Sequence, residues 1–319
     1  MRIRSKTAVG SIGCAVLLVA VAALLVLWDG GGGPEPLPVS PARPGEIDLR
    51  VMSFNVLQGR SSGSAGHWDE RKDIVVERIT AFGPDLLGTQ EVLDFQLDFL
   101  KKKLPGYEVV ARGRMKEPDA DEHAAIFFKA SRFEKLDEGH FWLSETPDVP
   151  GSKDWFTFRP RMTSWVKLRT RTEPPRTVVF FNCHVSPTSI HAKRESARII
   201  RERIREIAGG GPAILVGDFN TAADTETQRR FLAGAEPDGL RLADAFRALH
   251  AQPLPNEGTW HGPMGVRPDR RIDWVLATPH FTPVAAGIDR TARDGRYPSD
   301  HCPVTAVLRL GAESRPPAE

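Results

Sequence analysis

Several apolar runs of the sequence end in an acid, an amide or a histidine, the side chains that bind metals and transfer protons. In the run "PAILVGDFN", Asp218 and Asn220 follow five residues that are apolar or Gly. The same pattern recurs at Asn55 after "VMSF", Gln90 and Glu91 after "DLLGT", Asn182 and His184 around "VVFFNCH", Asp273 after "RRI", and Asp300 with His301 before "CPVTAVL". A buried acid is costly unless it is paired or used. Strand ends that converge in a layered α/β protein form a natural site, so these residues are candidates for one.

The chemistry that such residues favour is specific. Oxygen-rich ligands without paired cysteines suit a hard cation, Mg²⁺ or Mn²⁺, rather than structural zinc. A carboxylate and two histidines beside such an ion are what transfer of a phosphoryl group from an ester to water requires. The metal and nearby cations neutralise the phosphoryl oxygens, and a base orients the water.

The elements that must position these residues alternate along the chain. β-Branched, aromatic and apolar runs predict strands at 48–56, 85–92, 124–130, 139–144, 163–172, 176–185, 213–217, 271–278 and 302–310. Apolar stripes at helical spacing predict helices at 70–82, 93–104, 190–208 and 241–249. One α/β domain of two sheets with outer helices fits this order best. Alternation along a strand predicts that Asp218 and Asn220 share a face and that Phe219 points into the core.

The composition is that of a globular protein with a large core, since 40% of its 319 residues are hydrophobic and 26% are charged. The formal net charge is only +2. We therefore expect no strongly basic surface, which argues mildly against a protein that holds nucleic acid mainly through electrostatics.

The N-terminus predicts a membrane segment. Arg2, Arg4 and Lys6 precede an apolar run over residues 8–28, about as long as a bilayer-spanning helix of roughly 20 residues. We expect residues 1–28 to be a single-pass anchor in the cell membrane, with the remainder outside the cytoplasm. The alternative is a cleaved signal peptide and a secreted protein. Residues 29–45 form a Gly/Pro-rich linker, residues 46–310 the catalytic domain and residues 311–319 a disordered tail.

Six motifs, in order and spacing, resemble the endonuclease/exonuclease/phosphatase (DNase I-like) family. They are "SFNVLQG", "GTQEV", "NCHVS", "GDFN", "RIDWV" and "YPSDHCPV", and "FWLSETPDVPGSKDW" resembles a stretch of exported bacterial members. The family includes nucleases, deadenylases, sphingomyelinases and inositol-polyphosphate phosphatases. The resemblance implies a four-layered α/β sandwich, in which two packed β-sheets are flanked by helices.

The resemblance also implies a role for each candidate residue. Glu91 is the implied main metal ligand, with Asn55 beside it, and Mg²⁺ (or Mn²⁺) is the implied cofactor. His184 and Asn220 contact the phosphate, Asp218 activates the attacking water and Asp273 belongs to the polar network. Asp300 orients the imidazole of His301 or reaches the metal, and His301 brings positive charge to the phosphate. Glu122 and Arg161 are implied substrate contacts.

Some positions depart from the family pattern or stay open. Some members carry an acid two residues after the Asn and after the His of these motifs, where this chain has Leu57 and Ser186. These departures motivate a second hypothesis, a catalytically silent binding module. Trp155 and Phe158 either line a substrate cleft or belong to the core. Cys183 and Cys302 are either buried thiols or a disulfide, because spacing alone cannot set the distance between them.

The function predicted first is therefore that of a metal-dependent hydrolase of phosphodiester or phosphomonoester bonds. Its specific activity is either that of an endonuclease or 3'-5' exonuclease or that of a phospholipid or sphingomyelin phosphodiesterase. The expected partners are a phosphoester substrate (nucleic acid or a phospholipid head group) and the membrane at the N-terminal segment. We expect a monomer.

Overall fold

The computed structural model describes residues 40–61, 65–119, 121–233, 238–262, 265–266 and 270–312. The segment predicted as an anchor or signal (1–28), most of the linker (29–45) and nearly all of the tail (311–319) lie outside these residues. Among the described residues, no helix is both long and apolar enough to cross a membrane.

Two six-stranded mixed sheets form the centre of the domain. The first has the order β13 (Phe281–Ile288), β14 (Val304–Leu310), β1 (Ile47–Asn55), β2 (Leu86–Val92), β4 (His123–Lys129) and β3 (Tyr107–Val110). The second has the order β5 (Phe133–Trp142), β6 (Met162–Thr170), β7 (Thr177–His184), β8 (Ala213–Asp218), β12 (Asp273–Ala277) and β9 (Ala243–Asp244). The short strands β10 (His261–Gly262) and β11 (Gly265–Val266) pair separately. Only β1 with β2 and β7 with β8 run parallel; the other pairs in the two sheets are antiparallel.

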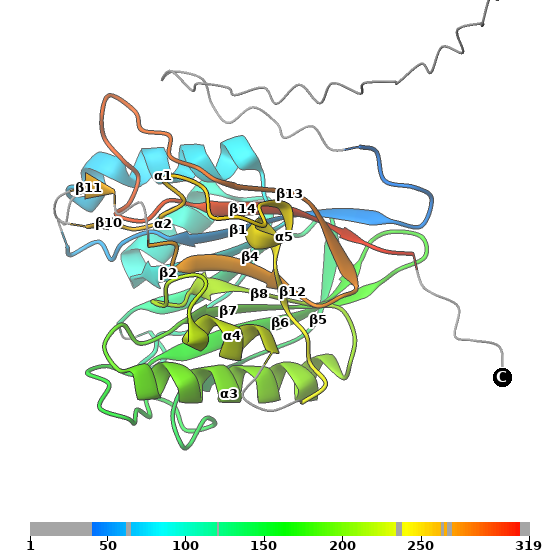
Figure 1. Cartoon of the computed structure of the whole chain (residues 1–319). Helices are drawn as coiled ribbons and strands as arrows, with labels where there is room; N and C mark the ends of the chain where they lie inside the picture. Colours follow the sequence, from blue (N-terminus) through cyan, green and yellow to red (C-terminus); the bar gives the residue numbers. More distant parts are fainter. Residues whose placement is uncertain are drawn as a thin grey trace, which may run out of the picture. The chain divides into compact units, whose positions relative to one another are not determined.

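Helices cover the outer face of each sheet (Figure 1). On the side of the first sheet lie α1 (Trp68–Phe82) and α2 (Asp94–Lys103), and on the side of the second lie α3 (Ile190–Ala208) and α4 (Glu226–Ala233). The short helix α5 (Ala245–Leu249) packs against β12 and β13. Helix α3 begins where the Ser189 side chain accepts a hydrogen bond from the Ala192 amide and ends at Gly209 in the left-handed conformation.

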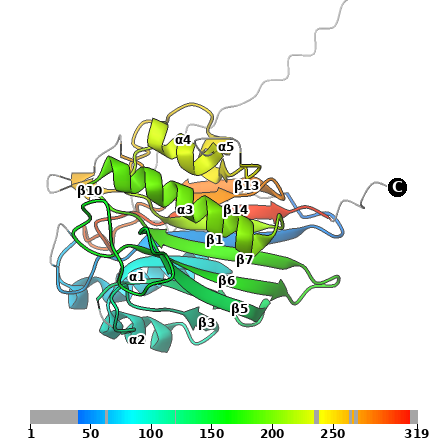
Figure 2. The same ribbon diagram turned by 90° about the horizontal axis from the view of Figure 1, so that it is seen from below.

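Three apolar layers fill the spaces between these four structural layers. Strand β8 shows the division, because Ile214 and Val216 belong to the core between the sheets while Leu215 packs with Ile200 and Ile204 of α3. Another layer joins the first sheet to α1 and α2. Figure 2, seen from below, shows the sheets stacked between the helices. The predicted four-layered α/β sandwich is therefore confirmed.

The structure corrects one predicted element and adds others. The helix predicted over 241–249 begins only at Ala245, because the Asp244 carboxylate accepts hydrogen bonds from the Phe246 and Arg247 amides and caps it there. The residues before it form the short strand β9. Strand β13 and helix α4 were not predicted; β13 contains Pro283 beside a register shift, which breaks the alternation that identifies a strand.

The sandwich has two distinct edges. The first residues of β1 pair with the last of β14 (Ile47 with Leu310), so the domain begins and ends at one edge. The carboxyl ends of β1, β2, β7 and β8 lie at the opposite edge. Antiparallel partners begin where these strands end, since Asp273 pairs with Asp218 and Met162 with His184. The register therefore brings the polar strand ends to one place, which we call the catalytic edge.

Gly88 of β2 allows the two sheets to approach closely near this edge. A Cβ atom at Gly88 would overlap the Val216 side chain and lie 2.8 Å from Asn182 Oδ1. Asn182 in turn accepts a 2.7 Å hydrogen bond from Gln90 and donates to the Thr89 and Ala125 carbonyls, so it bonds the second sheet to the first.

We predict that Gly88→Ala destabilises the protein by about 1–3 kcal/mol, because the added methyl overpacks the interface between the sheets. Gly106→Ala is the control, since a Cβ there meets nothing within 4 Å, and its effect should stay within about 0.5 kcal/mol. Denaturant unfolding of both variants measures the difference. Equal stabilities would contradict the close approach.

Candidate active site

Strand register assembles the part of the site that belongs to the second sheet. His184 ends β7 and pairs directly with Asp218, which ends β8, and Asp218 pairs on its other side with Asp273, which begins β12. Three predicted site residues thus lie side by side on adjacent strands. All three are at least 93% buried.

The first sheet contributes the other predicted site residues. Asn55 ends β1 and pairs with Gln90 of β2, so Glu91 is next to it, and Asp300 and His301 precede β14 on the other side of β1. Glu91 has a left-handed backbone with φ of 60° at a register shift between β2 and β4. Such a conformation is uncommon for a non-glycine residue and persists where the surroundings hold it, often at functional sites.

Asn55 joins the two groups. Its side-chain nitrogen donates 3.1 Å hydrogen bonds to Glu91 Oε1 and to Asp218 Oδ2, and its side-chain oxygen accepts from the Leu57 amide. This orientation of the amide makes Asn55 a donor that positions two carboxylates across the sheets. That Asn55 is a metal ligand stays a prediction. Metal binding would use its side-chain oxygen, which here accepts the hydrogen bond from the Leu57 amide.

Two histidines flank the Asp218 carboxylate. Asp218 Oδ2 lies 3.5 Å from His184 Nε2 and 3.8 Å from His301 Nε2. Burial raises the pKa of Asp218, and the nearby Asp273 carboxylate raises it further. Asp218 therefore lies between two imidazoles and has an increased affinity for a proton.

Asp273 favours the protonated form of His301. Its Oδ2 lies 2.9 Å from His301 Nδ1 and accepts a 2.6 Å hydrogen bond from the Thr259 hydroxyl. Burial by itself lowers the pKa of His301, but the Asp273 and Asp218 carboxylates raise it well above its ordinary value. Asp273 rather than Asp300 bonds this imidazole, because the antiparallel start of β12 places Asp273 there. The alternative role of Asp300, contact with the metal, stays a prediction. Asp300 lies on the Glu91 side, where burial and the Glu91 charge raise its pKa.

His184 has the opposite environment. Its Nε2 lies 2.7 Å from Arg161 Nη1, and its Nδ1 lies 3.8 Å from Glu122 Oε2. Burial lowers the pKa of His184 well below its usual value, and the Arg161 and Arg114 guanidinium groups lower it further. The surroundings therefore favour the neutral form of His184 and the charged form of His301 on the two sides of Asp218.

Glu122 and Arg161, the two predicted substrate contacts, do lie at the site, together with a residue that the sequence did not reveal. Arg114 pairs with Glu122 at 2.7 Å and with Asp121 at 2.9 Å. Burial raises the pKa of Glu122, as does the Glu91 charge. Arg114 follows no strand end and has no motif around it, so only the tertiary contact identifies it.

Asn220 lies at the site, but it is not part of a strand as predicted. Strand β8 ends at Asp218, and Asn220 has a left-handed backbone with φ of 49°. Its amide donates to Asp218 Oδ1 at 2.8 Å and its side chain donates to the Val185 carbonyl at 3.0 Å. Phe219 is fully buried as predicted, and its ring stacks on Trp274 at 4.3 Å between centroids.

The donor set fits a hard divalent cation. One oxygen or nitrogen of each of Glu91, His184 and Asp218 lies within 4.8 Å of the others, and a second such group comprises Asp218, Asp273 and His301. Glu91 raises the pKa of three neighbouring carboxyl groups, those of Glu122, Asp218 and Asp300. The buried Asp273 Oδ1 has no hydrogen-bond partner among the described residues. An excess of carboxylate charge of this kind favours Mg²⁺ or Mn²⁺, although it does not identify the metal.

The open questions about single residues have structural answers. Leu57 is buried with φ of 57°. Its carbonyl accepts hydrogen bonds from Arg71 and Gln96, so the hydrogen bonds of this residue are made by its backbone. Cys183 and Cys302 are buried free thiols. Phe158 is 81% exposed, which excludes a core role.

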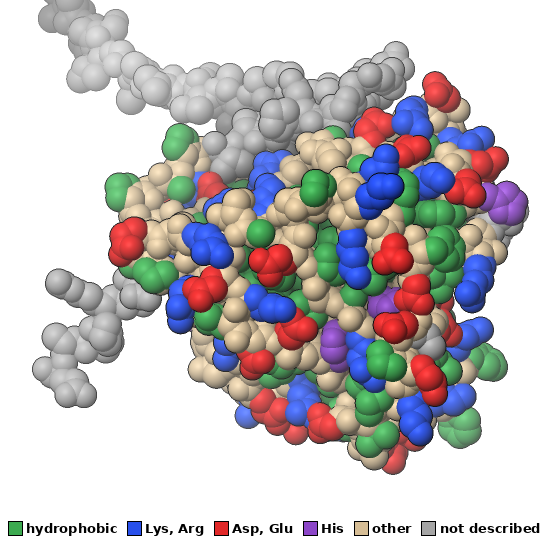
Figure 3. Space-filling view, turned by 180° about the vertical axis from the view of Figure 1, so that it is seen from behind, with side chains coloured by type: hydrophobic (Ala, Val, Ile, Leu, Met, Phe, Trp, Pro, Cys, Tyr) green, Lys and Arg blue, Asp and Glu red, His purple; other side chains and the backbone are tan. Residues whose placement is uncertain are grey.

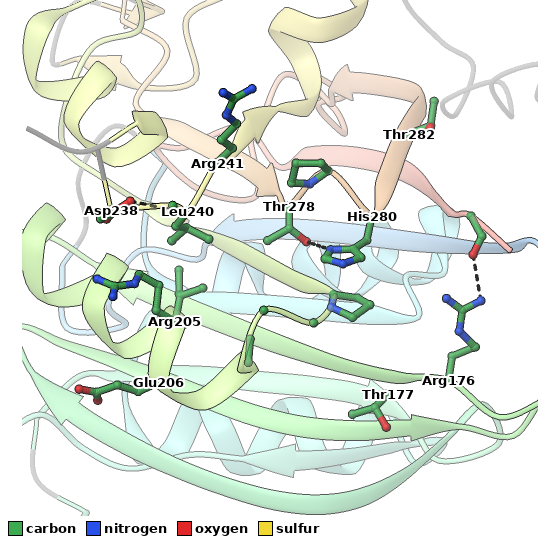
Figure 4. A pocket seen from close by; sticks show the side chains of 18 of the residues that line it. Arg176, Thr177, Arg205, Glu206, Asp238, Leu240, Arg241, Thr278, His280 and Thr282 are labelled. Atoms are coloured by element: carbon green, nitrogen blue, oxygen red, sulfur yellow. Dashed lines mark hydrogen bonds between the residues drawn. The ribbon is translucent and has the colours of Figure 1, made fainter. Parts of the chain in front are cut away.

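A large open hollow lies away from the catalytic edge. It has a volume of about 1260 Å³ and is lined by residues before β8 and after β12, at the opposite ends of these strands from Asp218 and Asp273. Figure 4 shows that its lining includes Arg205, Arg241, Glu206 and Asp238. The space beside His184, lined by Arg114, Glu122 and Arg161, measures only about 10 Å³ because the Arg161–His184 contact fills it.

The chain is similar to known proteins of one family. The sequence profile of the Endonuclease/Exonuclease/phosphatase family matches residues 52–301. A solved protein of that family from Bacteroides thetaiotaomicron is 30% identical, with a TM-score of 0.72, over 84% of this chain and 100% of its own. A mannosyl-6-phosphatase of the same organism is 32% identical, with a TM-score of 0.70, over 82% of this chain and 99% of its own.

Human nocturnin is a curated relative, 24% identical over 300 residues. The match covers 83% of this chain but 66% of nocturnin, just under two thirds of its length. On the profile match and the two bacterial structures, the chain belongs to the endonuclease/exonuclease/phosphatase family of hydrolases.

Proposed function

We propose that this protein is a divalent-metal-dependent phosphoesterase. The observation that carries the proposal is the position of the Asp218 carboxylate between His184 and His301, joined through Asn55 to the Glu91 carboxylate, on one edge of the sandwich. A base, a cation and a metal-binding carboxylate together are the groups that phosphoester hydrolysis needs.

Asp218 is the proposed base for the attacking water. Its raised pKa increases its affinity for the water's proton, and two donors, Asn55 Nδ2 and the Asn220 amide, fix its orientation. The charged His301 and the guanidinium of Arg161 are placed to bond phosphoryl oxygens, and Arg suits such oxygens because its donors form a planar fork. Glu91 and Asp218, with Asp300 nearby, would hold the metal. The ion, when bound, would neutralise charge on the phosphoryl group.

The substrate is proposed as a small or lipid phosphoester. On the face shown in Figure 3, basic and acidic side chains are interspersed rather than gathered by sign, which does not favour binding of long nucleic acid by charge alone. One bacterial relative is named as a mannosyl-6-phosphatase. Another relative, from Schizosaccharomyces pombe and 25% identical over 191 residues, is named as a probable RNA exonuclease, so a nuclease activity is the second candidate. Hydrolysis of plasmid DNA, RNA, sphingomyelin, phosphoinositides and mannose 6-phosphate, each with Mg²⁺ or EDTA, separates these substrates. Cleavage of nucleic acid alone would contradict the proposal.

On the sequence alone, we also propose that residues 1–28 anchor a monomeric enzyme in the cell membrane with its catalytic domain outside the cytoplasm. The intact mass of the mature chain tests this: a chain that has lost these residues would be the secreted form instead.

We predict that Mg²⁺ or Mn²⁺ stabilises the protein and that EDTA reverses the effect. Saturation to about 100 times the dissociation constant adds roughly 2.7 kcal/mol. Because burial raises the pKa of Asp218 and Asp300, both hold protons to higher pH, and the metal must displace those protons. The thermal shift should therefore be larger at about pH 8 than at about pH 5.

Glu91→Gln should abolish this thermal shift, while Glu108→Gln, on the exposed edge strand β3, should retain it. No metal-dependent shift in the parent protein, together with no turnover of any ester, would support the silent binding module.

We predict that Asp218→Asn lowers kcat by roughly 10²–10⁴, because the variant keeps the shape of the side chain but loses the base. Asp98→Asn on the exposed face of α2 is the matched control and should leave kcat unchanged. Steady-state rates on bis(p-nitrophenyl) phosphate or the best substrate measure both. Full activity of Asp218→Asn would refute the assignment.

A further inference from the structure

A ridge of exposed apolar side chains borders the catalytic edge. Phe156 is 96% exposed and Phe158 is 81% exposed, on the loop between β5 and β6, and Ile190 at the start of α3 is 62% exposed. The Trp155 ring meets the His191 ring edge-on at 6.2 Å, which places the loop against the start of α3. We call Phe156, Phe158 and Ile190 the aromatic rim.

The loop that carries the rim is firmly held. The Asp154 carboxylate accepts a 2.8 Å hydrogen bond from the Glu145 amide, and its carbonyl accepts from the amide and hydroxyl of Thr157. Trp155 and Phe156 both have left-handed backbones, with φ of 54° and 62°. Bulky residues rarely adopt this conformation, so the loop holds the two phenylalanines outward at an energetic cost.

The rim adjoins the residues that would bind phosphate. Arg159 follows Phe158 and pairs at 2.6 Å with Asp121, which also bonds Arg114. Arg161, two residues further on, contacts His184. The exposed rings therefore stand beside the entrance to the catalytic residues.

The shape of the rim decides between possible occupants. A site for a small molecule is concave and buries most of its ligand. A ring that is 96% exposed has almost no protein around it and cannot enclose a ligand. A lipid surface needs no concavity, because aromatic side chains sink into the boundary between head groups and acyl chains. Lys153 and Arg159, on either side of the two rings in the sequence, supply cations for lipid phosphates.

We propose that the aromatic rim is a membrane-docking surface, through which the protein sets its catalytic edge on a lipid bilayer. A lipid phosphoester as substrate then follows, a step that rests on the proposed function.

The test uses the full chain with Cys14→Ser, so that labels react only at introduced cysteines, since Cys183 and Cys302 are buried. An environment-sensitive fluorophore is placed at Phe156→Cys or, as control, at Leu249→Cys, an exposed apolar position on α5. Both proteins are bound to vesicles of phosphatidylcholine and phosphatidylglycerol with or without brominated acyl chains. Because both carry the same N-terminal segment, that segment cannot produce a difference between them.

We expect brominated lipid to quench the label at position 156 at least twofold more than the label at 249; equal quenching would overturn the proposal. Phe156→Ala with Phe158→Ala should lower the rate on vesicle-borne lipid at least tenfold, because two rings are no longer available for burial in the bilayer, and leave the rate on bis(p-nitrophenyl) phosphate unchanged. A raised KM for that soluble ester would instead show that the rings bind the substrate. Dimerisation abolished by the double variant would show that they bind a second copy; either result overturns the proposal.

The experiment can refute the membrane-docking surface and the proposed function independently of each other. Selective quenching at position 156 without hydrolysis of any ester would uphold the docking surface and refute the phosphoesterase. Hydrolysis without selective quenching would do the reverse.

Discussion

The buried carboxylate of Asp218 is the group on which the site depends, because it belongs to one sheet and is bonded by the other. Asn55 of β1 donates to it across the sandwich, while His184 and Asp273 lie beside it on the neighbouring strands. A buried charge without partners would be strongly destabilising. The partners that satisfy Asp218 are the same groups that the proposed hydrolysis would use, so stability and the proposed catalysis share one set of contacts at this edge.

That shared set explains the unusual electrostatics. Burial raises the pKa of Asp218 and of Asp300, the Glu91 carboxylate raises both further, and the nearby His301 offsets only part of this. The left-handed backbones of Glu91 and Asn220 show that the chain also departs from favourable conformations here. Strain and excess negative charge at one edge are what a protein retains when a cation and a substrate complete the site.

The sequence predicted where the site lies better than it predicted which side chains within the site bond to each other. Polar residues at the ends of apolar strands, such as Asp218 and His184, identify the catalytic edge because parallel strands end together. Which carboxylate bonds His301 depends on the antiparallel start of β12, and no local motif specifies strand order; that carboxylate is Asp273 rather than the sequence neighbour Asp300. Arg114 lacked any signal for the same reason. The exposure of Phe156 and Phe158 was equally hidden, since the same letters describe a core aromatic and an exposed one.

The proposed hydrolysis requires that the carboxylates at this edge hold a divalent ion. Crystals of the protein soaked in Mn²⁺ and measured at the manganese absorption edge can locate that ion, since the anomalous signal does not depend on activity. We expect a peak within about 2.0–2.4 Å of a Glu91 carboxylate oxygen, with Asp218 or Asp300 close by. Strong manganese peaks elsewhere and none at Glu91 would contradict it.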